Sequence, residues 1–277
     1  VDQLLASGEA VLGGTGRDVS VLFSDIRGFT SISERLGAKE TVALLNEYFT
    51  DMVDIVFAHN GVLDKYIGDM IMAVFGSVMQ SDDDASNAAL VGNRMMTALH
   101  QLNQRRAARG GEVIRIGVGI STGNVVAGNI GSLKRMEYTV IGDRVNLAER
   151  LESANKFYGT SILVCDATYA AIKDHSIARE IDLIRVRGRN MPTAIYEALD
   201  HHTEDSFPHL QDVLGAFNEG LVLYRQRDWV GAERCFRKVL LGNPQDNPSK
   251  IYLERCQIYR NTPPPEGWDG VWTMTSK

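Results

Sequence analysis

From residue 19 onward, short apolar segments typical of strands alternate with longer segments whose apolar residues recur at helical spacing. This alternation limits the fold more than any other feature of the sequence. Residues 19–23 form a continuous run typical of a buried strand. Residues 29–58 then carry apolar side chains at three- and four-residue spacing, which predicts a long amphipathic helix. Residues 62–66 and 70–75 predict two short strands joined by a tight turn.

The alternation continues to about residue 200. The further elements are predicted over 82–109 (helix), 114–120, 124–130 and 137–141 (strands), 144–156 (helix), 162–165 (strand), 167–172 (short helix), 181–186 and 194–199 (strands). A Ser-Thr-Gly turn is expected to join the strands on either side of residues 121–123. Because several strands adjoin in hairpins, the pattern favours an α+β fold with a mostly antiparallel sheet over a doubly wound parallel one.

Composition changes over residues 200–208, which are interpreted as a linker. We expect one domain over 1–202 and a small all-α extension over 203–277, with helices separated by two turns. The spacing of four tail residues resembles one tetratricopeptide-like repeat: Gly220, Ala232, Phe236 and Pro244. Both plain helical packing and binding of a protein partner are consistent with it. Deletion of the residues after about 203 is expected to distinguish a role of the tail in recruiting a partner from the activity of the first domain.

The bulk composition excludes several classes of protein. The 277 residues are 44% hydrophobic and 23% charged, and a net charge of −6 gives no reason to expect nucleic-acid binding. No apolar run approaches the roughly 18 residues that span a bilayer. Three widely spaced cysteines favour a reducing, cytoplasmic location, and no histidine pattern suggests a zinc site. The chain begins at Val1, not at Met, which suggests a piece of a longer protein.

Glycine motifs of nucleotide binding are absent from the sequence. The glycines at 117, 119 and 123 do not have the spacing of a dinucleotide-binding G-x-G-x-x-G motif, and no P-loop motif occurs. These glycines are expected to let strands turn and approach closely. A hydride-transfer enzyme and a P-loop enzyme are therefore disfavoured.

Two acids occupy positions where a scaffold presents rigid side chains. Asp25 follows a buried strand, and Asp69 lies in the turn of the predicted hairpin. If the fold brings them together, two carboxylates could hold two Mg²⁺ ions for an in-line displacement at phosphorus. On spacing alone, the favoured interpretation is still that Asp25 caps the next helix and Asp69 is an ordinary turn residue.

A second group of candidates could bind a nucleotide. Asn146 and Arg150 are one turn apart on a predicted helix, and an amide beside a guanidinium suits a ribose and a phosphate. The alternative is a solvated helix face. Lys65, four residues before Asp69, is equally compatible with an exposed strand lysine.

Four ordered motifs together change this balance. They are FSDIRGFT (23–30), KYIGDMIMAVFG (65–76), GVGISTGNVVAG (117–128) and YTVIGDRVNLAER (138–150). Taken in this order, they closely resemble the catalytic domain of class III nucleotidyl cyclases, over about residues 15–200. The resemblance implies a ferredoxin-like core and a homodimer with two shared sites.

The resemblance assigns roles to individual positions. Asp25 and Asp69 match the metal-binding aspartates, with the backbone carbonyl of Ile26 as a further ligand for two Mg²⁺ or Mn²⁺ ions. Asn146 matches the ribose-positioning asparagine, and Arg150 the arginine that stabilises the transition state. Arg187 stands where the family usually has a triphosphate-binding lysine; this departure keeps the charge but changes the hydrogen-bonding geometry, and the nearby Arg189 could share the role.

The same resemblance places Lys65 and Thr139 against the purine. A lysine ammonium only donates, which suits the unprotonated N1 of adenine and not the N1–H of guanine. Thr139 can accept from the adenine amino group, and threonine here resembles the bicarbonate-responsive subgroup. Because a threonine can also donate, it excludes guanine less firmly than aspartate would. The sequence therefore predicts an adenylyl cyclase acting on ATP, with a guanylyl cyclase and a catalytically silent nucleotide-binding module as alternatives.

Overall fold

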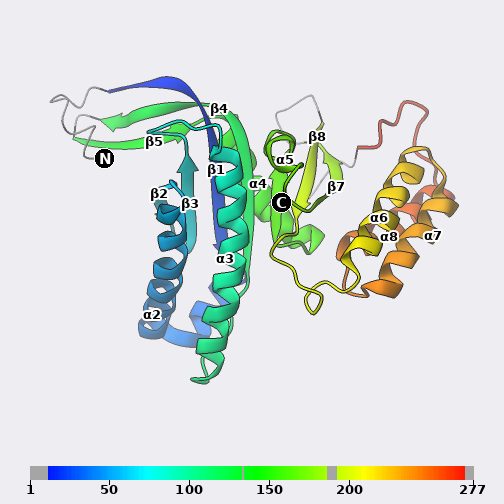
Figure 1. Cartoon of the computed structure of the whole chain (residues 1–277), viewed down its shortest axis with the longest axis horizontal. Helices are drawn as coiled ribbons and strands as arrows, with labels where there is room; N and C mark the ends of the chain where they lie inside the picture. Colours follow the sequence, from blue (N-terminus) through cyan, green and yellow to red (C-terminus); the bar gives the residue numbers. More distant parts are fainter. Residues whose placement is uncertain (1–11, 133, 186–191, 272–277) are drawn as a thin grey trace.

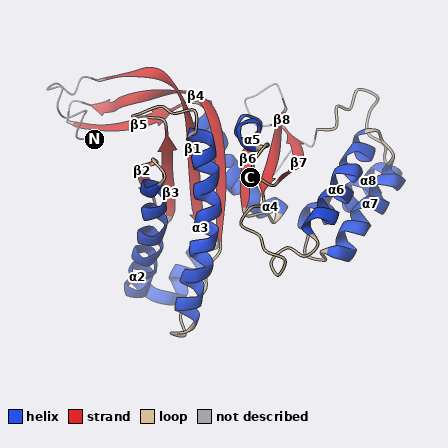
Figure 2. Ribbon diagram, viewed as in Figure 1, coloured by secondary structure: helices blue, strands red, loops and turns tan. Residues whose placement is uncertain are grey.

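The computed structural model describes residues 12–132, 134–185 and 192–271. Within them the strands are β1 (Gly13–Ile26), β2 (Val62–Ile67), β3 (Met70–Phe75), β4 (Ile116–Ser132), β5 (Arg135–Ile141), β6 (Ile162–Cys165), β7 (Ala178–Ile184) and β8 (Thr193–Ala198). They form one sheet in the order β2-β3-β1-β4-β6-β8-β7, with β5 paired to β4. Only the β4–β6 pair is parallel among the pairings in the described residues. The mostly antiparallel α+β sheet predicted from the sequence is confirmed (Figure 2).

The helices are α2 (Phe29–Ala58), α3 (Asp84–Ala107), α4 (Asp143–Tyr158), α5 (Asp166–Ile172), α6 (Leu210–Arg225), α7 (Trp229–Gly242) and α8 (Asn247–Asn261). Figure 1 shows α2 and α3 side by side along the sheet, and α6, α7 and α8 grouped beyond β7 and β8. None of the helices in the described part of the chain has the length and apolarity that a membrane crossing requires.

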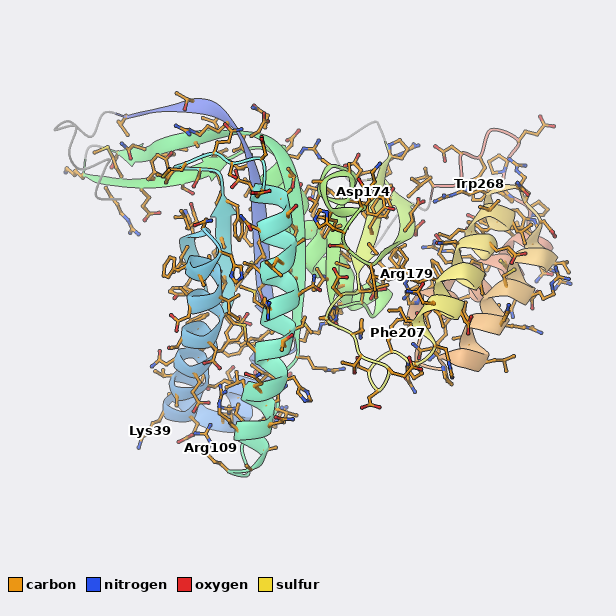
Figure 3. The ribbon with its side chains drawn as sticks, in the orientation of Figure 1. Lys39, Arg109, Asp174, Arg179, Phe207 and Trp268 are labelled. Atoms are coloured by element: carbon orange, nitrogen blue, oxygen red, sulfur yellow. The ribbon has the colours of Figure 1, made fainter. Side chains whose placement is uncertain are left out.

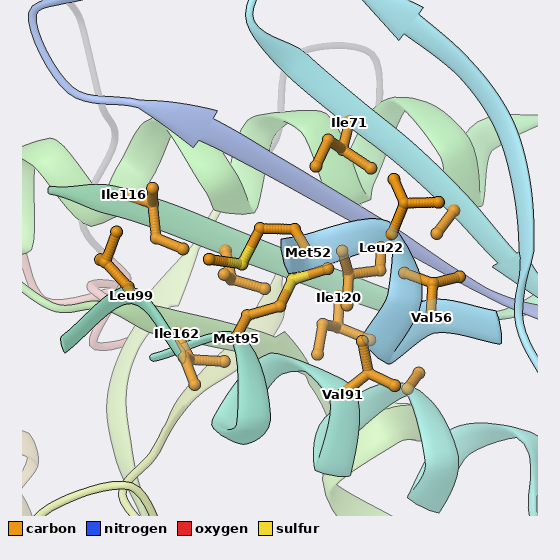
Figure 4. Close-up of a cluster of buried hydrophobic side chains, with 14 of the residues drawn as sticks. Leu22, Met52, Val56, Ile71, Val91, Met95, Leu99, Ile116, Ile120 and Ile162 are labelled. Atoms are coloured by element: carbon orange, nitrogen blue, oxygen red, sulfur yellow. The ribbon is translucent and has the colours of Figure 1, made fainter. Parts of the chain in front are cut away.

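Alternating side chains divide the sheet into two buried faces. Leu22 and Ile120 face α2 and α3, where they pack with Met52 and Met95 in the cluster drawn in Figure 4. The neighbouring Val21 on β1 belongs to a second cluster on the opposite face, which includes residues of α4. Because side chains alternate between the two faces of a strand, one face of the central strands packs against α2 and α3 and the opposite face against α4.

One expected turn does not form. Residues 121–123, predicted to end one strand and begin another, lie inside the continuous strand β4, where Val19 of β1 pairs with Gly123. The hydroxyl of Thr122 is 2.8 Å from that of Ser20 and 2.8 Å from that of Thr168. The Thr122 side chain thus contacts both β1 and α5, and the chain continues through residues 121–123 as a strand without the predicted turn.

The tail forms the predicted arrangement of helices and rests on the edge strand β7. Its core contains Phe217, Phe236 and Tyr252, and also Leu199 from the end of the first domain. Gly220 lies against Phe236, with room for no side chain larger than hydrogen. The tetratricopeptide-like character of the tail, and the domain boundary near residue 203, stay predictions.

Candidate active site

Asp25 lies at the end of the central strand β1, which is flanked by β3 and β4. It pairs with Gly117 of β4 in the strand register. The preceding Ser24 is fully buried, and its hydroxyl is 2.8 Å from that of Tyr48 on α2. A buried strand with hydrogen bonds on both edges therefore holds the Asp25 backbone at a fixed position.

Asp69 meets Asp25 from the turn between β2 and β3. Gly68 before it has a φ of 67°, a left-handed conformation that glycine adopts without steric cost. The two aspartate side chains interact directly, and Oδ2 of Asp69 is buried with no hydrogen-bond partner among the described residues. Burial and the adjacent Asp69 carboxyl raise the pKa of Asp25 to about 7. The structure thus brings together the two acids that the sequence singled out.

A third acid, Glu152 of α4, was not identified from the sequence. It is 7% exposed, and burial raises its pKa to about 7, although the Arg27 guanidinium partly opposes this. Its negative charge contributes to the raised pKa of Asp25. Glu152 lies four residues after the buried Ala148 and one after the buried Leu151. A carboxylate within an otherwise apolar helix face was the signal that could have found it.

Glycine lets α4 lie directly on the sheet beside these acids. A methyl group at Gly119 of β4 would lie 2.2 Å from the carbonyl oxygen of Ala148 and 2.2 Å from the backbone nitrogen of Glu152. Asn146 and Arg150 lie exposed on α4, one helical turn apart. The close approach of β4 and α4 fixes the position of the helix on the sheet, and with it the positions of Asn146 and Arg150. Arg187 and Arg189 lie outside the described residues.

The two residues predicted to contact the purine are Lys65 on β2 and Thr139 on β5. A cluster of polar side chains connects these two strands. The hydroxyl of Thr139 donates to Oδ2 of Asp64 over 2.9 Å. Nζ of Lys65 lies 3.4 Å from the same oxygen and 3.5 Å from Oε2 of Glu137. Lys65 and Thr139, which the sequence placed against one base, thus share Asp64 as a neighbour, and sequence reasoning did not find Asp64.

The acid pair has the chemistry of a magnesium or manganese site. Hard divalent ions prefer carboxylate and carbonyl oxygens, and an unpartnered buried carboxylate oxygen is costly until a cation or donor meets it. Asp25 and Asp69 supply carboxylate oxygens, and the backbone carbonyl of the adjacent Ile26 is the further ligand predicted from the resemblance. The described residues contain no group of three or more acidic, histidine or cysteine side chains placed to hold a metal ion. Further ligands would therefore come from backbone, water or substrate, as is usual for Mg²⁺.

The chain belongs to the family of adenylate and guanylate cyclase catalytic domains, because the model of that family matches residues 14–198. The terminal-differentiation specific adenylate cyclase of Dictyostelium discoideum is 34% identical over 244 residues, which are 87% of this chain and 11% of that protein. Adenylate cyclase 1 of Rhizobium meliloti is 36% identical over 183 residues, 66% of this chain and 28% of the relative. The chain thus spans only a minor part of the curated relatives it matches.

The similar solved structures share one fold, but some are named adenylyl cyclases and others guanylyl cyclases. The adenylyl cyclase CyaB from P. aeruginosa aligns with a TM-score of 0.64 at 38% identity, covering 69% of this chain and 98% of that one. The guanylyl cyclase Cya2 aligns with a TM-score of 0.62, also at 38% identity, covering 68% and 94%. Overall similarity therefore does not decide between adenine and guanine, and the choice rests on the residues of the site.

Proposed function

We propose that this chain is an adenylyl cyclase that converts ATP to 3′,5′-cyclic AMP and pyrophosphate at two sites of a homodimer. The observation that carries the proposal is the half-buried pair Asp25 and Asp69, in which the buried Oδ2 of Asp69 has no hydrogen-bond partner among the described residues. Such a pair suits two Mg²⁺ or Mn²⁺ ions, which when bound activate the attacking hydroxyl and neutralise charge on the triphosphate.

The remaining residues have binding and electrostatic roles. Asn146 is proposed to orient the ribose, and Arg150 to stabilise the charge that develops on the α-phosphoryl group as its bond to the β-phosphate breaks. Arg187 is proposed to bind the triphosphate. The new bond joins the ribose 3′-oxygen to the α-phosphorus, pyrophosphate leaves, and the hydroxyl proton passes to solvent. No side chain is assigned as a general base.

Base selection follows from Lys65 and Thr139. The Lys65 ammonium can only donate, so it is complementary to N1 of adenine and opposes the N1–H of guanine. Thr139 is proposed to accept from the 6-amino group. This argument, and not overall similarity, favours ATP over GTP.

The first experiment identifies the product. The purified chain is incubated with Mn²⁺ or Mg²⁺ and equal concentrations of ATP and GTP, and the products are identified by mass spectrometry. Cyclic AMP with pyrophosphate is expected. Cyclic GMP would overturn the base assignment while leaving the metal pair intact. No cyclic product at any protein concentration would favour the silent nucleotide-binding module.

The acid pair is tested by substitution. Asp25→Asn or Asp69→Asn is expected to lower kcat at least roughly a hundredfold, because each removes a charged carboxylate ligand of the metal ions that would neutralise the reacting phosphates. Asp174→Asn is the matched control, since Asp174 is an exposed aspartate just beyond the end of α5 (Figure 3). Near-normal turnover of either active-site variant with Mg²⁺ would refute the metal assignment.

The shared site is tested by mixing two inactive variants. If one protomer supplies Asp69 and its partner supplies Arg150, equal amounts of Asp69→Asn and Arg150→Ala chains form heterodimers with one intact site. Activity should then recover to about one quarter of the wild-type value. A mixture as inactive as its components would argue against a site built from two chains.

A further inference from the structure

The carboxylate of Asp64 is placed to determine which way the hydroxyl of Thr139 can hydrogen-bond. A threonine hydroxyl has one proton and two lone pairs, so it can either donate to a ligand or accept from it. In the structure that proton is committed to Oδ2 of Asp64 at 2.9 Å. Thr139 is 8% exposed and the Asp64 side chain 5% exposed, so water competes little for this bond.

A β-bulge gives Asp64 this position. Leu63 pairs with Ala73 of β3 and Lys65 pairs with Met72, so Asp64 is the extra residue in β2. In a regular strand, neighbouring side chains point to opposite faces of the sheet. The bulge breaks this alternation, and the Asp64 carboxylate and the Lys65 ammonium come within 3.4 Å of each other. One carboxylate oxygen thus contacts both residues assigned to the purine.

We propose that Asp64 is a positioning residue for base specificity, because it holds Thr139 as a hydrogen-bond acceptor toward the nucleotide. With its proton committed to Asp64, the Thr139 oxygen offers only lone pairs. Lys65 as donor and Thr139 as acceptor are then complementary to N1 and the 6-amino group of adenine. Guanine presents the reverse pattern, N1–H and an O6 acceptor, and meets two mismatches. The proposal rests on the proposed cyclase function and explains how a threonine could exclude guanine.

The structure offers a matched set of variants. Asp64→Ala removes the acceptor and frees the Thr139 proton to turn toward O6 of guanine. Asp64→Asn keeps a carbonyl oxygen that can accept from Thr139 in the same place. Glu137→Gln is the control for charge, because Oε2 of Glu137 is 3.5 Å from the Lys65 ammonium and the hydroxyl bond of Thr139 goes to Asp64.

The readout is the ratio of kcat/KM for ATP to kcat/KM for GTP, measured with Mn²⁺. Asp64→Ala is expected to lower this ratio at least about tenfold, which is the effect of about 1.4 kcal/mol. Asp64→Asn should retain most of the wild-type ratio, and Glu137→Gln should leave it unchanged. A merely structural role for Asp64 would lower both values of kcat/KM together and leave the ratio constant.

A double variant tests whether the effect passes through Thr139. In a Thr139→Val background there is no hydroxyl to orient, so adding Asp64→Ala should no longer change the ratio. An unchanged ratio in the single Asp64→Ala variant, or an equal change in the Thr139→Val background, would overturn the proposal. If Asp64→Ala does not fold, Thr139→Ser and Thr139→Val ask the same question, since only serine can still donate to Asp64.

Failure of the proposed function gives a different result. If the wild-type chain makes no cyclic nucleotide, the ratio is measured as the ratio of dissociation constants for ATP and GTP with the same variants. Wild-type preference for ATP that Asp64→Ala reduces would then support the positioning role without catalysis. No wild-type preference at all would refute it.

Discussion

Acidic side chains that are half-buried or fully buried occur in two regions of this molecule, and their surroundings are opposite. In the catalytic domain, the charges of Asp69 and Glu152 contribute to the raised pKa of Asp25. The charge of Asp69 also contributes to the raised pKa of Glu152, and the Arg27 guanidinium opposes that rise. Burial is the largest cause of the raised pKa of Asp25 and of Glu152, each of which is about 7. These carboxyl groups are therefore costly to ionise until a cation arrives.

At the junction with the tail, each buried acid meets an arginine. Nη1 of Arg255 on α8 donates to Oδ2 of Asp182 on β7 over 2.6 Å, and both side chains are at most 2% exposed. The hydroxyls of Tyr158 and Tyr252 donate to the same carboxylate at 2.7 Å and 3.0 Å. Asp182 is thus surrounded by donors.

A second arginine repeats this arrangement beside the first. Arg179 of β7, labelled in Figure 3, lies 2.7 Å from Oε2 of Glu197 and 2.6 Å from Oδ1 of Asp246. The bond to Asp246 crosses from the sheet to the start of α8. The comparison teaches that burial of an acid does not by itself indicate function. The acids that pair with buried arginines connect the tail to the sheet. The active-site acids, which have no such arginine partner, can instead bind a cation.

The largest effect is expected from removing a buried partner. Arg255→Ala leaves the Asp182 charge buried, which should lower the free energy of unfolding by about 3–5 kcal/mol. Arg237→Ala is the control: its ion pair with Glu233 is 64% exposed on the arginine side and should contribute about 0.5 kcal/mol or less. Urea unfolding followed by tryptophan fluorescence measures both, because all three tryptophans lie after residue 228. Equal losses in the two variants would break the comparison.

The second largest effect is expected from lowering the pH, which should weaken the junction between the sheet and the tail. Burial and the neighbouring His202 lower the pKa of His201 to about 3, and burial and Arg179 lower the pKa of His202 to about 4. Both pKa values are below the unfolded value of 6.5, so the stabilisation from neutral histidines is complete above pH 6.5. It is lost progressively as the pH falls toward 4. Roughly 2 kcal/mol should disappear between pH 6.5 and pH 5.

The urea midpoint measured against pH checks this expectation. His201→Phe with His202→Phe should flatten the profile between pH 5 and pH 6.5. The exposed His100 serves as control, and His100→Gln should leave the slope as it is. A wild-type midpoint that stays constant over this range would contradict the assignment.

The active-site acids should respond in the opposite direction. The folded pKa of Asp25 is raised above its unfolded value of 3.8, so its ionisation costs stability increasingly from about pH 4 to pH 7 and fully above that. In the presence of a chelator, Asp25→Asn should therefore be more stable than wild type at pH 8, by about 1 kcal/mol after discounting for solvent screening. At pH 4 the gain should vanish. Adding Mn²⁺ at pH 8 should stabilise wild type and remove the difference.

Sequence patterns identified the structural features that depend on residues close together in the chain. The turn that presents Asp69 is confirmed, because alternation and turn residues are local properties. The strand predicted over 19–23 is longer, and Asp25 lies inside β1, one residue before its end. Strand β7 begins at Ala178, earlier than predicted, and contains Arg179 and Asp182. The charge of Arg179 concealed this earlier start in the sequence, since Asp246, one of the two acids that pair with it, is 67 residues away. Asp64 was missed for a similar reason, because a bulge and a partner 75 residues distant define its role.

The smallest effect should come from an ion pair with nearly the same geometry and different burial. Nη2 of Arg185 lies 2.8 Å from Oδ2 of Asp269, close to the 2.6 Å of the Arg255–Asp182 pair, but its side chains are 44% and 49% exposed. Arg185→Ala should cost less than about 0.5 kcal/mol, and 0.5 M NaCl should mask most of that loss because water and salt screen an exposed pair. The same urea titration compares it with Arg255→Ala. A loss as large as that of Arg255→Ala would mean that bond geometry, and not burial, determines the stability of the junction.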